Sequence, residues 1–224
     1  KIYKYQNLYD LLKSAVDSIV VMQNSLRFYS LIDLDKYNFD VLKEEITEII
    51  DLYFPYKKID SSFSKEFLDT WENEFYKYNF DFTSFVHKDF NMNNLILRPS
   101  EKGHLKCGVI DFQSAFWGES SWDLFSLLED SRMLFTDEFN DYFIEYFYKH
   151  TNQNISLNDF IIKFHFLNCS RQTRLLGRWV KLSKELKQKW YLDFIPFTQS
   201  RLKKSINLLN NKKLSEFYNK YILN

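Results

Sequence analysis

The chain has 224 residues, of which 45% are hydrophobic and 19% are aromatic. This length suffices for one large domain with a substantial core, and so high an aromatic content excludes a disordered or fibrous protein. Its 30 Lys and Arg residues balance 30 Asp and Glu residues, so the formal net charge is zero. We therefore expect neither nucleic acid nor an anionic membrane as a partner, and any anionic ligand must be bound by local contacts.

The two cysteines, Cys107 and Cys169, lack the paired spacing of a zinc site or a disulfide framework. We expect them to be free thiols in a reducing compartment. No run approaches the roughly 20 apolar residues that a bilayer span needs, and the first residues lack the pattern of a signal peptide. These features predict a cytoplasmic protein. The chain begins at Lys1 rather than Met, which favours an N-terminal truncation.

The first third of the chain predicts only helices. Apolar residues at helical spacing predict a helix from Asn7 to about Phe28, a second from Phe39 to about Phe54 and a third from Ser62 to Lys77. In the third, four aromatic residues fall four apart on one face: Phe63, Phe67, Trp71 and Phe75. All three helices are expected to pack an apolar face on a core.

The pattern changes at Thr83. Short apolar runs predict strands at 84–87, 95–97 and 105–110. A polar loop separates the first two runs, and the third ends abruptly at Asp111. We expect this loop and this strand end to carry the chemistry.

From Trp122 onward the pattern is helical again, with a capping box predicted at Ser156 and Asp159. The expected fold class is α+β and mainly helical, with a small cluster of strands, in a single domain covering residues 1–224. The expected later helices are Trp122 to Met133, Asp137 to Tyr148, Leu157 to about Leu182, Pro196 to Leu209 and Ser215 to Tyr221.

Two short motifs supply the groups of a phosphoryl-transfer site. The first runs from His87 to Asn94 (His-Lys-Asp-Phe-Asn-Met-Asn-Asn), and the second is Val-Ile-Asp-Phe, with Asp111 17 residues after Asn94. The reaction needs a carboxylate that accepts or orients the proton of the substrate hydroxyl, and oxygen ligands for Mg²⁺ from an Asn carbonyl and a second carboxylate. Asp89, Asn94 and Asp111 supply these groups in the expected order. A His-x-Asp triplet alone would be a weak signal, but the joint pattern is specific.

With these motifs the sequence resembles the aminoglycoside phosphotransferase and choline kinase superfamily. The pattern of that superfamily is His-Gly-Asp, four residues, Asn, and then a strand ending in Ile-Asp-Phe. A Gly and an Asp that opens a helix follow the second motif in that pattern, and Gly118 and Asp123 stand at those positions. The resemblance implies the C-terminal lobe of a protein-kinase-like fold, with its small strand cluster at the catalytic loop.

The resemblance also implies the roles of single residues. Asp89 would be the catalytic base or the orienting carboxylate, and His87 and Asp123 would support its loop. Asn94 and Asp111 would hold Mg²⁺ and, through it, ATP or GTP.

A closer resemblance is to the bacterial anomeric kinases of N-acetylmuramate and N-acetylglucosamine, which act in peptidoglycan recycling. Lys88, Gln113 and the stretch from Asp123 to Asp130 carry it, and the similarity extends from about Tyr9 to Lys204. It implies an amino sugar as the small-molecule substrate. Asn91 departs from the family, which usually has His or a comparable residue there. The candidate substrate residues are Lys88, Asn91, Gln113, Arg171 and Arg174.

No glycine-rich phosphate loop precedes the helices, and neither does a strand with a Lys that could pair with nucleotide phosphates. A small N-terminal lobe supplies both in a complete kinase. We therefore expect the 224 residues to be the C-terminal catalytic lobe alone, poorly active by itself, with Lys1 to Tyr5 as a remnant of the connection between lobes.

Two charged stripes on predicted helices are compatible with different acceptors. Arg171, Arg174 and Arg178 share one helical face, which is either solvated or a cationic wall for an anionic substrate such as a lactyl carboxylate. An acidic stripe on the second predicted helix is either solvated or a site for sugar hydroxyls or the ammonium groups of an aminoglycoside: Glu44, Glu45, Glu48 and Asp51. The alternatives are an aminoglycoside or choline-like alcohol kinase, or a non-catalytic relic that binds metal or a partner.

Overall fold

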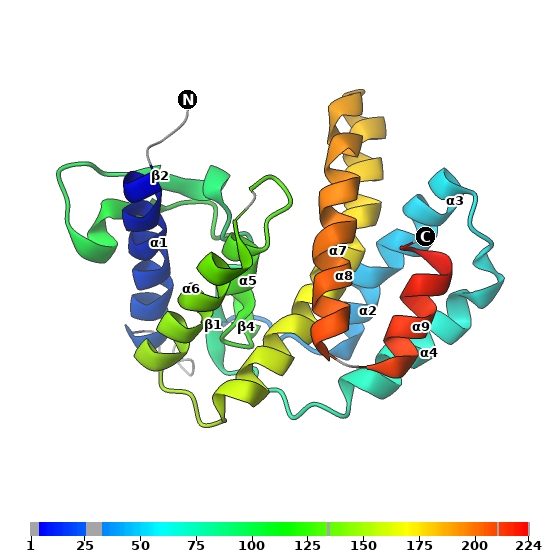
Figure 1. Cartoon of the computed structure of the whole chain (residues 1–224), viewed down its shortest axis with the longest axis horizontal. Helices are drawn as coiled ribbons and strands as arrows, with labels where there is room; N and C mark the ends of the chain where they lie inside the picture. Colours follow the sequence, from blue (N-terminus) through cyan, green and yellow to red (C-terminus); the bar gives the residue numbers. More distant parts are fainter. Residues whose placement is uncertain (1–4, 26–32, 134, 210, 224) are drawn as a thin grey trace. The chain divides into compact units, whose positions relative to one another are not determined.

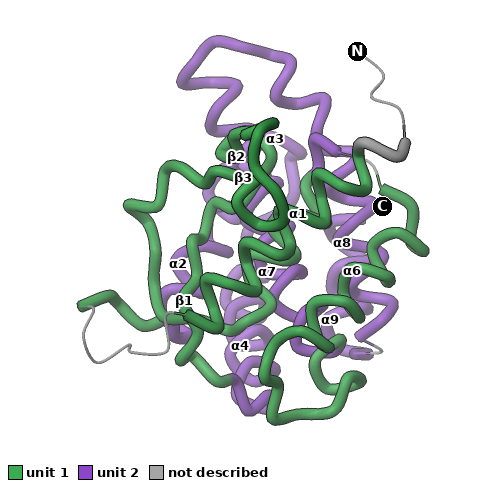
Figure 2. The backbone as a smooth tube through the Cα atoms, turned by 90° about the vertical axis from the view of Figure 1, so that its left-hand side faces the viewer, with its two compact units in different colours: residues 1–36, 81–130, 135–161 green, residues 37–80, 131–134, 162–224 purple. Residues whose placement is uncertain are grey.

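The computed structural model describes residues 5–25, 33–133, 135–209 and 211–223 (Figure 1). Two expectations therefore lie wholly or partly outside the described residues: the remnant at Lys1 to Tyr5 and the end of the first helix near Phe28. The chain forms two compact units, each assembled from separate stretches of sequence (Figure 2). Unit 1 comprises residues 1–36, 81–130 and 135–161, and unit 2 comprises residues 37–80, 131–134 and 162–224.

The described residues of unit 1 form three complete helices, the first turn of a fourth and two small antiparallel sheets. The complete helices are α1 (Tyr5–Ser25), α5 (Trp122–Leu128) and α6 (Asp137–His150). Strand β1 (Ser84–Val86) pairs with β4 (Phe116–Gly118), with Phe85 opposite Trp117. Strand β2 (Leu95–Leu97) pairs with β3 (Cys107–Val109), with Ile96 opposite Gly108. Short 3-10 turns at Met92–Asn94 and Gly103–Lys106 precede β2 and β3.

The helices of unit 1 bury the apolar faces that their sequences predict. In α1, Leu12, Val16 and Ile19 are completely buried. Helix α6 begins after Thr136, whose hydroxyl oxygen accepts a hydrogen bond from the Phe139 N–H at 3.3 Å and so satisfies one of the free N–H groups of the first turn.

In unit 2 the described residues form helices joined by turns and loops, with no strand. Unit 2 contains α2 (Phe39–Glu48), a π-helical turn (Ile49–Tyr53), α3 (Phe54–Lys57), α4 (Ser64–Phe75), most of α7 (Leu157–Glu185), α8 (Ile195–Leu209) and α9 (Lys212–Tyr221). Further 3-10 turns lie at Ser61–Phe63 and Lys189–Phe194. The predicted aromatic stripe of the third helix is buried, with Phe67 and Trp71 completely so.

Helices α7 and α8 lie side by side in unit 2 (Figure 1), where buried polar groups join them. The Trp179 indole N–H donates to the Thr198 hydroxyl at 2.8 Å, and the Asn168 amide donates to the Ser205 hydroxyl at 2.9 Å. Helix α7 also passes very close to the end of α2. A Cβ atom at Gly177 would lie 2.5 Å from the carbonyl carbon of Glu48, so only glycine fits at this position.

The predicted fold class is confirmed, since the structure is mainly helical with small antiparallel strand pairs. Both cysteines are free thiols. The capping box is also present: the Ser156 hydroxyl oxygen accepts the Asp159 N–H at 3.1 Å, and this hydroxyl donates to the Asp159 carboxylate at 2.7 Å. In the described part of the chain, no helix is long and apolar enough to cross a membrane.

Several predicted boundaries were wrong. The second helix changes to a π-helical turn after Glu48 and stops at Lys57, because Lys58 adopts a left-handed conformation with φ of 56°. The third begins only at Ser64, after a 3-10 turn. Helix α5 ends at Leu128 rather than Met133, and the next residue, Glu129, is buried and accepts a hydrogen bond from the Asn140 amide at 2.9 Å.

The strands and the later helices also differ in detail. The run at 105–110 begins as a 3-10 turn, and only Cys107–Val109 is a strand. Strand β4 and the 3-10 turn at Lys189–Phe194 were not predicted. The later helices extend somewhat further than predicted: α6 and α7 at their C-terminal ends, and α8 and α9 at their N-terminal ends.

Candidate active site

The loop from His87 to Asn94 follows β1 and is anchored by two buried rings. His87 is 1% exposed and Phe90 is completely buried, and their rings contact edge to face with centroids 5.8 Å apart. Between them, Lys88 is half-buried and Asp89 is exposed. The anchors thus present the Asp89 carboxylate to solvent from a fixed backbone. That carboxylate has no hydrogen-bond partner among the residues that the structure describes.

The main-chain carbonyl of Asp89 accepts three hydrogen bonds. One comes from the Asn91 N–H at 2.9 Å, one from the Asn91 side-chain amide at 3.0 Å and one from the Asn94 side-chain amide at 2.9 Å. Because the Asn94 amide nitrogen binds this carbonyl, the side-chain oxygen of Asn94 stays available to a ligand. Asp89 and Asn94 are therefore held together by the backbone of the loop.

Ile110 connects this loop to the second motif. Its N–H donates to the Asn94 carbonyl at 3.1 Å, and its own carbonyl lies 3.0 Å from His87 Nε2. Asp111 follows immediately, exposed and with φ of 72°. The two main-chain groups of Ile110 thus bring the second motif against the loop that carries Asp89 and Asn94.

The His87 imidazole is oriented by this contact. A carbonyl oxygen can only accept, so Nε2 carries the proton and donates to Ile110. Burial lowers the pKa of His87 below its ordinary value, although the Ile110 contact and the nearby charges of Asp89 and Asp111 raise it. Nδ1 is buried and has no hydrogen-bond partner among the described residues.

Asp123 binds the main chain of the loop through its carboxylate. This side chain is completely buried at the start of α5. One carboxylate oxygen accepts the His87 N–H at 2.8 Å, and the other accepts the Lys88 N–H at 3.1 Å. Complete burial raises the pKa of the Asp123 carboxyl to about 7, while the two N–H donors lower it and the charge of Asp89 raises it.

Asp123 is expected to make the stability of the fold depend on pH. Between the ordinary pKa of 3.8 and the folded value of about 7, the folded chain binds a proton that the unfolded chain does not. The free energy of unfolding therefore falls as pH rises through this range. Asp123→Asn should remove this contribution, which urea unfolding of both proteins across the range would measure. An identical pH dependence in the two proteins would contradict the assignment.

Two non-glycine residues of the site have left-handed backbone conformations. Lys88 has φ of 77° and Asp111 has φ of 72°. Such conformations cost on the order of 1–3 kcal/mol each and persist only where surrounding contacts impose them. The contacts at Lys88 are the Asp123 carboxylate on its N–H and the Phe116 ring, whose centroid lies 5.5 Å from Nζ. Phe116 was not identified as a site residue from the sequence, because β4 was not predicted.

The remaining candidates lie outside the two motifs. Gln113 is exposed, just after the second motif. Arg171 is 6% exposed and belongs to unit 2, as does Arg174. Arg174 pairs with Glu45 at 3.3 Å and Arg178 pairs with Glu48 at 2.6 Å. Two residues of the cationic stripe on α7 thus bind two residues of the acidic stripe on α2.

The residues of the two motifs fit a magnesium site. The described residues contain no cluster of three or more His, Cys, Asp or Glu side chains that could hold a metal. Asn94 and Asp111 instead offer one amide oxygen and one carboxylate. Mg²⁺ is commonly bound by one or two such groups together with substrate phosphates and waters.

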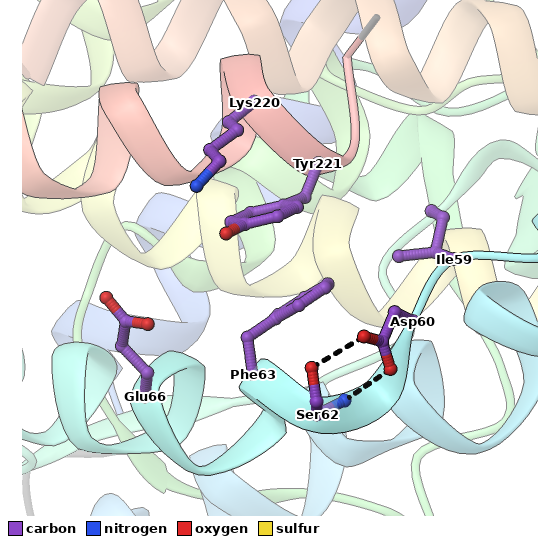
Figure 3. Close-up of a pocket in the computed structure, with 7 residues that line it drawn as sticks. All are labelled: Ile59, Asp60, Ser62, Phe63, Glu66, Lys220 and Tyr221. Atoms are coloured by element: carbon purple, nitrogen blue, oxygen red, sulfur yellow. Dashed lines mark hydrogen bonds between the residues drawn. The ribbon is translucent and has the colours of Figure 1, made fainter.

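A pocket of about 610 Å³ lies in unit 2 (Figure 3). In it Phe63 and Tyr221 stack with centroids 4.0 Å apart, and the Asp60 carboxylate accepts hydrogen bonds from the Ser62 N–H and hydroxyl at 2.9 and 2.7 Å. No residue of either motif lines this pocket. It therefore adds nothing to the case for phosphoryl transfer.

Comparison with known proteins decides the family. A profile of the phosphotransferase enzyme family (APH) matches residues 39–152, just over half of the chain. The chain belongs to this family. The match contains both motifs and Asp123, but neither Arg171 nor Arg174. The resemblance to the aminoglycoside phosphotransferase superfamily is confirmed.

Two curated relatives of this phosphotransferase have the same name, N-acetylmuramate/N-acetylglucosamine kinase. The protein from Caulobacter vibrioides is 31% identical over 116 residues, which cover 52% of this chain and 32% of that relative. The protein from Neisseria meningitidis serogroup B is 31% identical over 103 residues, which cover 44% of this chain and 29% of that relative. The match thus spans about a third of the length of these relatives.

Proposed function

We propose that this phosphotransferase moves the terminal phosphoryl group of ATP or GTP to the anomeric hydroxyl of N-acetylglucosamine or N-acetylmuramate. Residues 1–224 would act as the C-terminal catalytic lobe of the kinase. The observation that supports the proposal is the pair of hydrogen bonds between Ile110 and the loop of the first motif, one donated to the Asn94 carbonyl and one accepted from His87, because they join the two motifs next to Asp111. The names of the two relatives support the choice of acceptor.

In this proposal Asp89 receives or orients the proton of the attacking hydroxyl. The sugar oxygen forms a bond to the terminal phosphorus, the bond from that phosphorus to the bridging oxygen breaks, and the nucleoside diphosphate leaves. Asn94 and Asp111 would hold Mg²⁺, which neutralises phosphate charge when bound. The exposure of Asp89 and Asp111 supports these roles, because both carboxylates are free to meet ligands. The presence of Asp89, Asn94 and Asp111 together speaks against a non-catalytic relic.

The other residues of the site would position these groups. Asp123 fixes the main chain at His87 and Lys88, and His87 fixes Ile110 through its Nε2 proton. Lys88 lies within the first motif and Gln113 directly follows the second. Both would contact the acceptor or the phosphates. Together these residues would hold the attacking hydroxyl and the phosphate in line. Such alignment accounts for much of the rate enhancement in phosphoryl transfer.

The charge pairs of unit 2 engage two of the four carboxylates that could bind the ammonium groups of an acceptor, while Glu44 and Asp51 are exposed. Glu45 and Glu48 are neutralised by Arg174 and Arg178, and the first pair is largely buried, with side chains 10% and 13% exposed. An aminoglycoside needs unpaired carboxylates to bind its ammonium groups. This pairing also leaves Arg174 engaged, so Arg174 is a weaker candidate for a contact to a lactyl carboxylate.

The acceptor is tested by nucleotide consumption with four compounds offered separately: N-acetylglucosamine, N-acetylmuramate, kanamycin and choline. The 224-residue chain and the product of the complete coding region should both be assayed. With the complete product we expect turnover with an amino sugar and background rates with kanamycin and choline, and we expect the 224-residue chain to be poorly active by itself. The methyl glycoside of N-acetylglucosamine is the matched control, because its anomeric oxygen is blocked. Equal consumption of that glycoside would exclude the anomeric hydroxyl as the acceptor.

A further inference from the structure

We propose that Asn91 is a positioning residue that fixes Asp89 and Asn94, and that it makes no contact with the acceptor. The proposal rests on the phosphotransferase function proposed above. The sequence suggests Asn91 as a substrate contact, because it departs from the family there. In the structure, however, the nitrogen and the oxygen of the side-chain amide both form hydrogen bonds within the loop.

Each end of the Asn91 amide has a defined partner. The amide nitrogen donates to the Asp89 carbonyl at 3.0 Å, and the amide oxygen accepts the Asn93 N–H at 3.1 Å. The second contact caps the 3-10 turn at Met92–Asn94. Asn91 is half-buried, and no further partner of this side chain lies among the described residues.

Asn91 and Asn94 bind the same carbonyl oxygen. The Asn94 side chain donates to the Asp89 carbonyl at 2.9 Å, and its N–H donates to the Asn91 carbonyl at 2.9 Å. Asn91 thus holds the residue with the reactive carboxylate and also the turn that presents the amide oxygen of Asn94. Loss of its side chain would remove one of the three hydrogen bonds to the Asp89 carbonyl and, at the same time, the cap of the turn.

A small displacement at this position is costly. In a reaction whose rate depends on alignment, a shift of about 1 Å can reduce turnover by roughly 100-fold. Because Asn91 acts through its neighbours, its loss should reduce kcat and leave the KM for the acceptor nearly unchanged. A direct substrate contact would raise that KM instead.

Three variants of the full-length protein test the proposal: Asn91→Ala, Asn91→Asp and the control Asn93→Ala. The Asn93 side chain makes no hydrogen bond with a described residue, although it lies in the same turn. Asn91→Asp keeps the oxygen that accepts the Asn93 N–H but replaces the donor to Asp89 with a second acceptor. It therefore separates the cap of the turn from the contact to Asp89.

Two measurements apply to each variant. Hydrogen exchange of peptides covering residues 87–97 should become faster in Asn91→Ala and in Asn91→Asp, and stay unchanged in Asn93→Ala. With an acceptor that the wild type phosphorylates, kcat should fall roughly 10- to 100-fold in both Asn91 variants, with the KM for the acceptor within about threefold of wild type.

The proposal is overturned by any of three results: unchanged exchange in Asn91→Ala, wild-type behaviour of Asn91→Asp, or a raised acceptor KM with unchanged kcat. If the wild type phosphorylates no acceptor, the proposed function fails but the exchange measurement still decides whether Asn91 fixes the loop. Unchanged exchange in peptides from the rest of the chain establishes that a variant has folded.

Discussion

Replacement of Asp89 by Asn is expected to lower kcat of the full-length phosphotransferase by about 100-fold or more. The amide has the same size but cannot accept the hydroxyl proton, and it lacks the charge that orients that hydroxyl. The loop should keep its structure, because the contacts of Asp89 within it come from its main-chain carbonyl rather than its carboxylate. Steady-state turnover at saturating nucleotide and acceptor measures the effect.

Asp141→Asn is a suitable control for the charge change. Asp141 is an exposed residue of α6 in the same unit, and its side chain has no hydrogen-bond partner among the described residues. This variant should retain wild-type turnover. Near-normal turnover of Asp89→Asn would exclude Asp89 as the base or orienting group, whatever the acceptor.

Replacement of Gly177 by Ala is expected to destabilise the protein by about 1–3 kcal/mol. The added methyl group would lie 2.5 Å from the carbonyl carbon of Glu48, which belongs to the main chain and cannot rotate away. Helix α7 would have to move from the end of α2, and both charge pairs that flank this contact would be disturbed. Urea unfolding followed by circular dichroism measures the loss.

Gly108→Ala controls for the general effect of removing a glycine. At Gly108 a methyl group would meet its nearest atom, the carbonyl oxygen of Ile96, at 3.4 Å, which is close to ordinary contact. Its stability should change by less than about 1 kcal/mol, which is typical of a substitution without a steric clash. If Gly177→Ala is no less stable than Gly108→Ala, the close approach of α7 to Glu48 is wrong.

The helices and the two motifs could be predicted because their signals are local. The aromatic spacing of α4 and the apolar faces of α1 and α6 repeat within a few turns of one helix, and burial in the structure follows that repeat. The motif residues are recognised by type and spacing alone. Strand β4 could not be found in this way, because three residues are too few for a periodic pattern and its pairing with β1 joins residues at least 30 positions apart.

The geometry of the site was less predictable than its composition. No residue type indicates that Ile110 joins the two motifs, because the contacts use its main-chain groups, which every residue except proline possesses. The arginine and glutamate stripes were each found on a helical face, but their pairing depends on two helices separated by more than 100 residues. The role of Asn91 could not be predicted either, because its amide contacts depend on the 3-10 turn at Met92–Asn94, which was not predicted.

The discontinuous make-up of the units also affects the order in which the chain can fold during synthesis. Unit 1 is complete once residue 161 has left the ribosome, whereas the first segment of unit 2, residues 37–80, must wait for residues 162–224. Some 80 residues separate these segments, which at about 5–20 residues per second amounts to roughly 4–16 s. Throughout that interval Phe67 and Trp71 lack the partners that bury them in the finished protein. The nascent chain therefore exposes the aromatic face of α4 to solvent until the last part of unit 2 has been synthesised.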